Sequence, residues 1–301
     1  MNLLKLNLVL LLLFCTAALS AQEPDTATAG LFKQDQLKLI ASDFSFTEGC
    51  SPNQYGDVFF TDQPNDKIWK YSREGNLSIS LDQSGRANGT YFDSKGNLVV
   101  CADAKGELWA IHPSGKIKVL LADFEGKQFN GPNDLWINAK GGIYFTDPHY
   151  KRDYWTRTGI DLSSNDVYYL PKGAKQARRV AAGMVRPNGI VGTPDGKYLY
   201  IADIGANKTY QYSIKQNGDL ADKRLLMEYG SDGMTLDEKG NIYLTTSEGV
   251  LIFNAKGLRI AKIKLPHQPS NLCFYGKEKN MLFITARQAI YSLPMNVKGI
   301  E

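Results

Sequence analysis

The sequence has few cysteines and histidines and only one long hydrophobic run. Its 301 residues include four cysteines and three histidines, and His112, His149 and His267 are far apart. No Cys or His spacing suits a zinc site. Lys and Arg number 35 against 31 Asp and Glu, without a basic cluster, so nothing indicates nucleic-acid binding. No internal segment is apolar and long enough to predict a transmembrane helix.

The hydrophobic run lies at the N-terminus. Lys5 precedes an almost unbroken apolar stretch over residues 6–14, and small residues follow as far as Ala21. This order predicts a secretory signal peptide over residues 1–21, because the run is too short to span a bilayer. We therefore expect a secreted or periplasmic protein. Lipoprotein anchoring through Cys15 is the alternative, although the bulky Phe14 before it fits such a site poorly.

An eight-residue frame recurs six times in the rest of the chain. Each copy begins with an oxygen-bearing side chain and ends eight positions later at a glycine or, in the last copy, a lysine. The first members are Glu48, Asn88, Asn133, Asn188, Asp232 and Asn271, and the last members are Gly56, Gly96, Gly141, Gly196, Gly240 and Lys279. Polar turn residues precede most of these end positions, and short β-branched and aromatic runs follow them, which predicts a hairpin at each copy.

The spacing of these hairpins predicts the fold class. Successive end positions are 39 to 55 residues apart, and a four-stranded propeller blade takes roughly 40 to 50 residues. We therefore predict an all-β, six-bladed β-propeller over residues 37–301, preceded by a flexible segment over residues 22–36. Ring closure is expected to place residues 37–40 as the outer strand of the last blade, beside residues 290–293. A β-sandwich or a solenoid with coincidental spacing is the alternative.

The six oxygen-bearing residues, called the ring donors below, are expected to meet at the mouth of the central channel. One Glu, one Asp and four Asn offer oxygen ligands and no nitrogen or sulfur ligand. Ca²⁺ accepts six to eight oxygens in flexible geometry, amide carbonyls included, whereas Mg²⁺ demands a tight octahedron. Any single Asn or Asp before Gly would indicate only a turn. Six in one register predict a central divalent-metal site with Ca²⁺ as the expected ion.

Several stretches resemble the SMP-30/gluconolactonase/LRE family. They are residues 46–49, 131–134, 186–190, 193–196 and 231–235, and the likeness extends over essentially the whole chain after the signal peptide. The resemblance implies a six-bladed propeller that hydrolyses lactones, typically sugar lactones, and so a role in carbohydrate metabolism. Some relatives cleave organophosphates instead. No protein partner is predicted, and the expected partner is a small-molecule lactone.

The resemblance also implies roles for the ring donors. The catalytic divalent cation, usually calcium, would be held by Glu48, Asn133, Asn188 and Asp232. Asn88 and Asn271 would lie nearer the substrate or the channel than the ion.

Asp232 is the expected catalytic residue. Calcium polarises a carbonyl as a Lewis acid but acidifies bound water only weakly, so a protein base is needed. Asp232 is the carboxylate best able to contact both ion and attacking water, while Glu48 is assigned to metal binding alone. Direct attack by Asp232 to form an acyl-enzyme remains open, and so does a purely structural role as a ligand.

Substrate contacts are expected from Asp134, His149 and Tyr150, in addition to Asn88 and Asn271. His149 and Tyr150 begin a long insertion that reaches about residue 166, and a long ordered loop in a compact domain is commonly functional. We expect a lid or specificity loop there, and a surface excursion without a role is the alternative. Some sugar-lactone hydrolases of this family have an arginine two positions before the metal-binding Asn of the third blade, where this chain has Gly131.

Two other functions remain compatible with the sequence. One is a binding propeller in which calcium only rigidifies the channel, although such modules do not need an axial ring of carboxylates and amides. The other is a phosphotriesterase of the same fold.

Beyond the signal peptide the cysteines are Cys50, Cys101 and Cys273. Cys50 and Cys273 each follow a ring donor by two residues in blades that would be neighbours, so a disulfide and buried thiols are both compatible.

Overall fold

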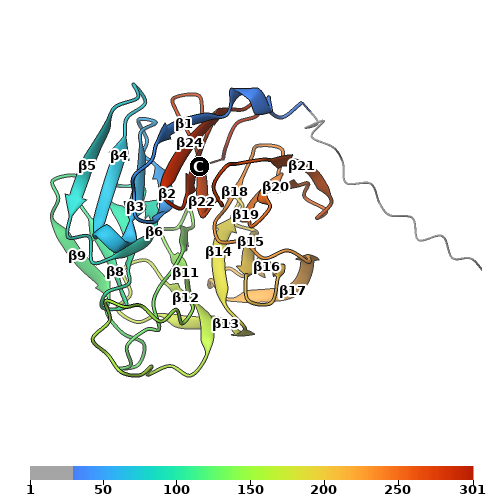
Figure 1. Ribbon diagram of the computed structural model, residues 1–301. Helices are drawn as coiled ribbons and strands as arrows, with labels where there is room; N and C mark the ends of the chain where they lie inside the picture. The colour runs from blue at the N-terminus through green and yellow to red at the C-terminus, as the bar shows by residue number, and fades with distance from the viewer. Residues whose placement is uncertain (1–29, 301) are drawn as a thin grey trace, which may run out of the picture.

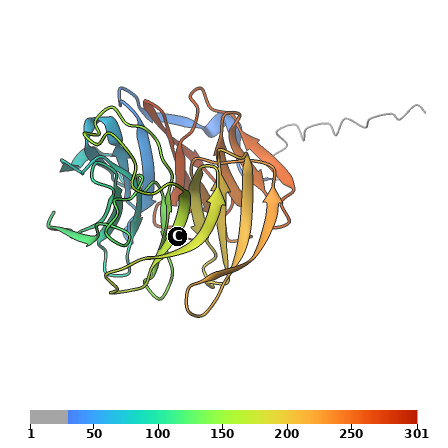
Figure 2. The same ribbon diagram turned by 90° about the horizontal axis from the view of Figure 1, so that it is seen from below.

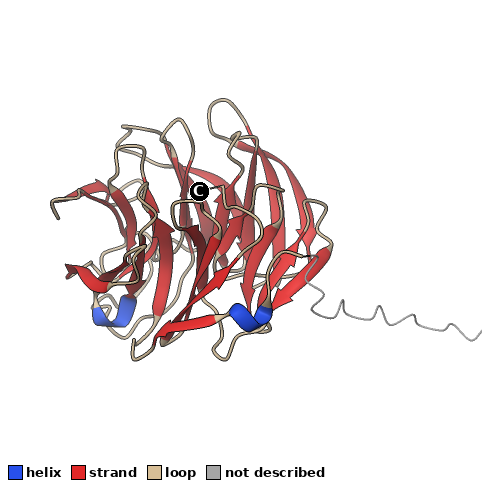
Figure 3. Ribbon diagram, turned by 90° about the horizontal axis from the view of Figure 1, so that it is seen from above, coloured by secondary structure: helices blue, strands red, loops and turns tan. Residues whose placement is uncertain are grey.

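The computed structural model describes residues 30–300, and strands make up nearly all of its regular structure (Figure 3). Six antiparallel four-stranded sheets follow one another around a ring (Figure 1). The predicted six-bladed β-propeller is therefore confirmed. Two short 3₁₀ helices, η1 (Gln34–Gln36) and η2 (Gln63–Asn65), occur in this part of the chain. The predicted signal peptide and Cys15 lie outside the described residues. No helix within residues 30–300 is long and apolar enough to cross a membrane.

Each blade has four strands, numbered here from the channel outward. The first strands are β2 (Thr47–Pro52), β6 (Ala87–Phe92), β10 (Leu135–Ile137), β14 (Pro187–Gly192), β18 (Met234–Leu236) and β22 (Asn271–Tyr275). The second strands are β3 (Val58–Asp62), β7 (Leu98–Ala102), β11 (Ile143–Asp147), β15 (Tyr198–Asp203), β19 (Ile242–Thr246) and β23 (Met281–Ala286). The third strands are β4 (Lys67–Tyr71), β8 (Glu107–Ile111), β12 (Asn165–Leu170), β16 (Lys208–Ile214), β20 (Gly249–Phe253) and β24 (Ala289–Pro294). The outer strands are β5 (Leu77–Asp82), β9 (Ile117–Leu121), β13 (Arg178–Met184), β17 (Leu220–Met227), β21 (Arg259–Ile263) and β1 (Lys38–Ala41).

The hydrophobic core lies between the blades. Second strands such as β7 and β11 are buried along their whole length, because each sheet has a neighbour on both faces. Figure 2 shows the strands of one such sheet, β14 to β17, side by side. Tyr144, Leu199 and Leu244 come from three successive second strands and belong to one buried cluster. Burial on both faces explains why the sequence shows continuous apolar runs here rather than alternation.

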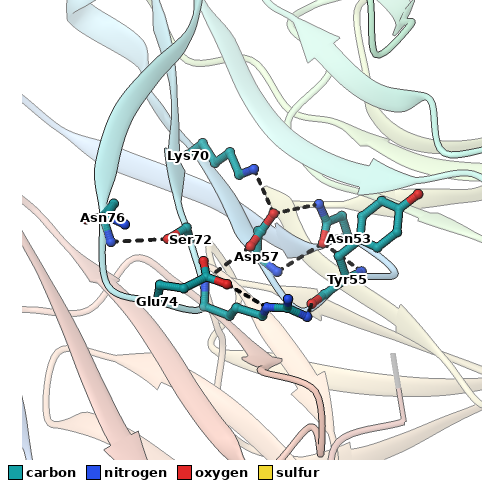
Figure 4. A network of polar contacts seen from close by, with 8 residues as sticks. Asn53, Tyr55, Asp57, Lys70, Ser72, Glu74 and Asn76 are labelled. Carbon is teal, nitrogen blue, oxygen red and sulfur yellow. Dashed lines mark hydrogen bonds and ion pairs between the residues drawn. The ribbon is translucent and has the colours of Figure 1, made fainter.

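The first hairpin shows how polar turn residues fix the blade. Asn53 Oδ1 accepts hydrogen bonds from the backbone N–H groups of Tyr55 and Asp57 at 2.9 and 3.0 Å (Figure 4). Asp57 Oδ2 in turn forms an ion pair with Lys70 Nζ of the third strand, β4, at 2.7 Å. The Asn53 side chain thus accepts the hydrogen bonds of backbone N–H groups that have no backbone acceptor within the turn.

The end position of each repeat takes a left-handed backbone conformation. Gly56 has φ +87°, and Lys279 has φ +54° where the other five copies have glycine. A hairpin joins the first and second strands at all six copies, which confirms the hairpin predictions.

The ring closes as predicted. Strand β1 pairs antiparallel with β24, with Lys38 opposite Ser292 and Leu39 opposite Tyr291. The last blade therefore takes its outer strand from the beginning of the domain and its other three strands from the end of the chain. The first strands also form a closed cycle, because β2 contacts both β6 and β22.

The prediction that residues 22–36 are flexible is wrong for residues 30–36, which pack against the propeller. Leu31 and Phe32 are each 3% exposed and pack in the core cluster of the fifth and sixth blades. Phe32 forms a β-bridge with Met295, and the N–H of Asn296 donates to Leu31 O at 2.7 Å. Burial of these two large apolar side chains offsets part of the conformational entropy that the segment loses when it becomes ordered, and the β-bridge and the hydrogen bond add to this stabilisation. The propeller domain therefore begins near residue 31, and the rest of the predicted segment lies outside the described residues.

Removing residues 30–41 is expected to abolish cooperative unfolding. The deletion exposes the edge of β24 and the apolar surface that Leu31 and Phe32 cover, so the last blade no longer connects the two ends of the ring. Urea unfolding followed by both circular dichroism and tryptophan fluorescence should then give broad, non-coincident transitions. A chain that begins at residue 22 is the control. A sharp transition with unchanged midpoint and slope in the shortened chain would contradict the role assigned to this closure.

Candidate active site

All six ring donors lie at or next to the start of a first strand, on one face of the propeller. Glu48, Asn88, Asn133, Asn188 and Asn271 are buried, with 2 to 6% of their surface exposed, whereas Asp232 is partly exposed. The start of these strands is where the connection from each outer strand turns into the channel. The repeat found in the sequence therefore corresponds to one repeated position in space.

Glycines allow the donor-bearing segments to approach one another. In four blades the residue after the donor is glycine, and a Cβ on Gly49 would lie 1.9 Å from the carbonyl oxygen of Asn88 in the next blade. A Cβ on Gly233 would lie 2.4 Å from Asn271 Cγ. No side chain fits at these distances. These glycines were not among the predicted site residues, although their position directly after the donors was a signal in the sequence.

Threonines of the second strands connect each blade to the next. Thr61 Oγ1 donates to Asn88 O at 3.0 Å, and Thr146 Oγ1 donates to Asn188 O at 2.9 Å. Thr245 Oγ1 makes the corresponding bond to Ser270 O, also at 2.9 Å. Each hydroxyl thus fixes the backbone at or beside a donor of the neighbouring blade. This role was not predicted, because the sequence indicates only that these threonines lie in strands.

Side-chain hydrogen bonds join the donors across the mouth. Asn188 Nδ2 donates to Asp232 Oδ1 at 2.7 Å and to Tyr150 Oη at 3.0 Å. Asn271 Nδ2 lies 3.4 Å from Glu48 Oε2. The structure therefore brings together three of the four expected metal ligands and two of the expected substrate residues.

Glu48 and Asp232 form a close pair of acids. Burial and then the nearby Asp232 carboxylate raise the pKa of Glu48 well above its usual value, and burial raises the pKa of Asp232. Two like charges this close in a buried site disfavour each other. Without a cation the pair therefore retains a proton in a pH range where isolated carboxylates would have lost theirs.

The donor set fits a hard divalent cation. Such an ion would replace the retained proton and allow both carboxylates to ionise, and the remaining donors are amide oxygens of the kind that Ca²⁺ accepts. Within residues 30–300 no three His, Cys, Asp or Glu side chains are grouped as a metal site. The ring has only two such side chains, and its other members are asparagines.

The remaining expected substrate residues occupy different surroundings. Asp134 accepts hydrogen bonds from the N–H groups of Leu135 at 2.9 Å and Ile190 at 3.4 Å. With Asn271 it lines a cavity of about 20 Å³ in the channel, which is room for about one water. The ring of His149 packs against Trp155 with centroids 5.8 Å apart, and burial lowers its pKa. Roles in binding substrate stay predictions for all five residues, Asn88, Asp134, His149, Tyr150 and Asn271.

The insertion occupies residues 148–164 and follows β11, the second strand of its blade. Tyr154 Oη donates to Asp103 Oδ2, and the Arg157 guanidinium donates to Phe129 O at 2.7 Å and to Asn130 O. Arg157 also lies 3.7 Å from the centre of the Trp155 ring. These contacts anchor the insertion onto the mouth-side loops of the second and third blades.

Gly131 has no space for a side chain. A Cβ there would lie 2.4 Å from Asp103 Oδ1 and 3.2 Å from Trp155. Asp103 and the Trp155 of the insertion thus occupy the space that a side chain at this position would need.

The three cysteines of the domain are buried thiols. Cys50 and Cys273 belong to one core cluster with Phe60 and Phe283, and Cys101 lies in β7. Burial raises the pKa of Cys101 well above its usual value. The structure thus contains the thiol alternative rather than the disulfide.

Comparison with known proteins gives a consistent set of relatives. The gluconolactonase of Zymomonas mobilis is 29% identical over 281 residues, which cover 83% of this chain and 78% of the relative. A lactonohydrolase of Aspergillus oryzae is 26% identical over 64% of this chain and 50% of its own length. A solved gluconolactonase structure from Xanthomonas campestris superposes with a TM-score of 0.81 at 25% identity, covering 86% of this chain and 89% of that one.

A family model provides the assignment. It describes the SMP-30/gluconolactonase/LRE-like region and matches residues 46–288, which include all six ring donors. The match spans far more than half of the 301 residues. This chain therefore belongs to the SMP-30/gluconolactonase/LRE-like family.

Proposed function

We propose that this protein is a calcium-dependent lactonase that opens a lactone ring, with sugar lactones as the substrate class. The observation that carries the proposal is the close Glu48 and Asp232 pair, surrounded by amide donors at the mouth of the channel. The names of the Zymomonas and Aspergillus relatives support the lactone as the bond attacked. The N-terminal apolar run supports export, with lipid anchoring as the alternative.

The expected metal ligands are Glu48, Asn133, Asn188 and Asp232. A calcium ion bound there would polarise the lactone carbonyl as a Lewis acid. Asn133 and Asn188 would contribute uncharged amide oxygens, so the two carboxylates balance the ion. Glu48 would serve as a ligand only, since its buried carboxylate lies beside Asn271 Nδ2.

Asp232 is proposed as the general base. It is the partly exposed member of the ring, and Asn188 fixes one of its oxygens while further lone pairs remain to accept a proton. Water attacks the carbonyl carbon and gives its proton to Asp232, and the C–O bond of the ring then breaks. The same carboxyl can return the proton to the leaving ring oxygen, which yields the hydroxy acid.

Tyr150 is proposed to contact the substrate. Burial raises the pKa of Tyr150 to about 12, so the hydroxyl keeps its proton at neutral pH. It accepts a hydrogen bond from Asn188 and can donate its own proton to an oxygen of the lactone. Tyr150 thus connects the insertion to the reacting centre.

Removing calcium is expected to abolish lactone hydrolysis and lower thermal stability. The assay compares glucono-1,5-lactone, an aryl-ester lactone and an organophosphate triester, first with calcium and then with a chelator. Calcium at 100 times its Kd should stabilise the fold by about 2.7 kcal/mol, because an ion that binds the folded chain and not the unfolded chain shifts the folding equilibrium by mass action. Glu48→Gln is the matched variant, and it should lose both activity and the calcium-induced shift in Tm.

The same assay separates the alternatives. Turnover of the triester alone would favour a phosphotriesterase. A calcium-induced shift in Tm without turnover of any compound would favour a binding propeller. Lactone turnover that survives complete chelation would contradict the proposed metal dependence.

A further inference from the structure

Two arginines flank the tyrosine that connects the insertion to the reacting centre. The guanidinium carbons of Arg152 and Arg186 lie 5.1 and 5.0 Å from the centre of the Tyr150 ring. The Tyr150 hydroxyl shares Asn188 Nδ2 with Asp232. Both guanidiniums therefore lie at the mouth, next to Tyr150, which is connected to the proposed base Asp232 through Asn188.

Arg152 comes from the insertion and has hydrogen-bonding capacity to spare. Its Nε lies 3.4 Å from Asp103 Oδ2, at ion-pair distance, but this buried nitrogen makes no hydrogen bond to any residue among 30–300. Asp103 Oδ2 already accepts the Tyr154 hydroxyl. The side chain of Arg152 is 24% exposed, so part of it reaches the solvent of the mouth.

Arg186 comes from the loop before β14, two positions before the ring donor Asn188. Its side chain is exposed, and no acidic side chain in the described part of the chain forms an ion pair with it. Its printed hydrogen bonds are made by the backbone: the N–H donates to Asp203 Oδ1 at 2.8 Å, and the carbonyl oxygen accepts from the N–H of Ile204 at 3.1 Å. The guanidinium is therefore available to a ligand.

We infer that Arg152 and Arg186 form an anion clamp at the mouth, and that the preferred substrates are lactones that carry a carboxylate or a phosphate. The inference rests on the proposed lactonase function. A guanidinium in a partly desolvated site binds such groups with paired, charge-assisted hydrogen bonds. A divalent cation between Glu48 and Asp232 would balance their two charges, so the floor of the site would not repel the anion. The insertion is then the specificity loop, with Arg152 as its determinant.

The test uses two lactones that differ only at C6. Glucaro-1,4-lactone has a carboxylate at C6 where glucono-1,4-lactone has a hydroxymethyl group. The wild-type protein with calcium should show a kcat/KM at least ten-fold higher for the charged compound, mainly through KM, and added salt should reduce this advantage. A second pair, 6-phosphoglucono-1,5-lactone and glucono-1,5-lactone, tells a phosphate preference from a carboxylate preference.

Arg152→Gln should lower the charged-to-neutral ratio of kcat/KM by about 10- to 100-fold, which is the usual effect of a lost charge-assisted hydrogen bond. Arg152→Lys should restore part of the ratio, because the charge returns without the planar fork. Arg186→Gln should act in the same direction. Arg224→Gln is the control, since Arg224 lies on the outer strand β17 and donates to Gln211 Oε1 at 2.8 Å.

The outcomes separate this inference from the function on which it rests. If wild type hydrolyses none of the four lactones, the proposed function fails. If it hydrolyses neutral and charged lactones equally well, or if Arg152→Gln slows both members of a pair by the same factor, the clamp is wrong and the lactonase stands. Circular dichroism and Tm confirm that each variant is folded, so a lost ratio is not an effect of unfolding.

Discussion

Asp232→Asn should lower kcat/KM for the lactone by about 10²- to 10⁴-fold, the usual contribution of a positioned general base, while calcium remains bound. The asparagine keeps an oxygen for the metal and a group that Asn188 can contact, but it cannot take the proton of the attacking water. The measurement pairs initial rates with calcium titration by calorimetry. Asp219→Asn is the control, because Asp219 lies in the turn before β17, far from the mouth, and contacts Asn217 and Arg178.

Two other results would change the role of Asp232. If calcium affinity falls together with activity and saturating calcium restores the rate, Asp232 acts only as a ligand and the proposed role as base is wrong. If a single turnover in ¹⁸O-labelled water leaves the label in the Asp232 carboxyl group, the carboxylate attacks the lactone directly and forms an acyl-enzyme. Label only in the released hydroxy acid agrees with attack by water.

Gly49→Ala should destabilise the protein by about 2 to 5 kcal/mol. Overpacking a tight contact costs roughly 1 to 3 kcal/mol, and the left-handed backbone adds about 1 to 2 kcal/mol for a residue with a Cβ. Both costs apply here, because Gly49 has φ +46° and its Cβ would lie 1.9 Å from Asn88 O. Urea unfolding with and without calcium gives the free energy, and calcium affinity should fall too, since Glu48 is displaced.

Gly196→Ala isolates the backbone cost. Gly196 has φ +66°, and a Cβ there would meet nothing within 4 Å. This variant should lower the free energy of unfolding only by the cost of the left-handed backbone conformation, about 1 to 2 kcal/mol. Equal losses in the two alanine variants would show that the first and second blades can separate at the axis, which would contradict the close approach assigned to Gly49.

The parts of the fold that sequence could predict are those with local causes. Polar turns followed by a left-handed residue and an apolar run identify each hairpin within a dozen residues, so even Lys279 was placed correctly. The ring donors emerged because one position repeats in every blade. The packing of Leu31 and Phe32 could not be found this way, since their partners Met295 and Asn296 are more than 260 residues away.

Which side chains of the insertion lie at the mouth could not be predicted from the sequence, because this depends on tertiary contacts. The insertion that begins with His149 has no repeat to define its register, and Tyr150 reaches Asn188 while His149 turns toward Trp155. The glycine at position 131 was visible in the sequence, but the lack of space for a side chain there was not. Only the structure shows Asp103 and Trp155 in that space, with Arg152 on the same insertion.

The narrowness of the channel beside Asp134 and Asn271 has a kinetic consequence. A space of about 20 Å³ admits a water but not a sugar, so this cavity offers a sugar lactone no second exit. Substrate and product would then share the mouth. If the two arginines bind an anionic group of the hydroxy acid as they are proposed to bind that of the lactone, we expect competitive product inhibition at high conversion.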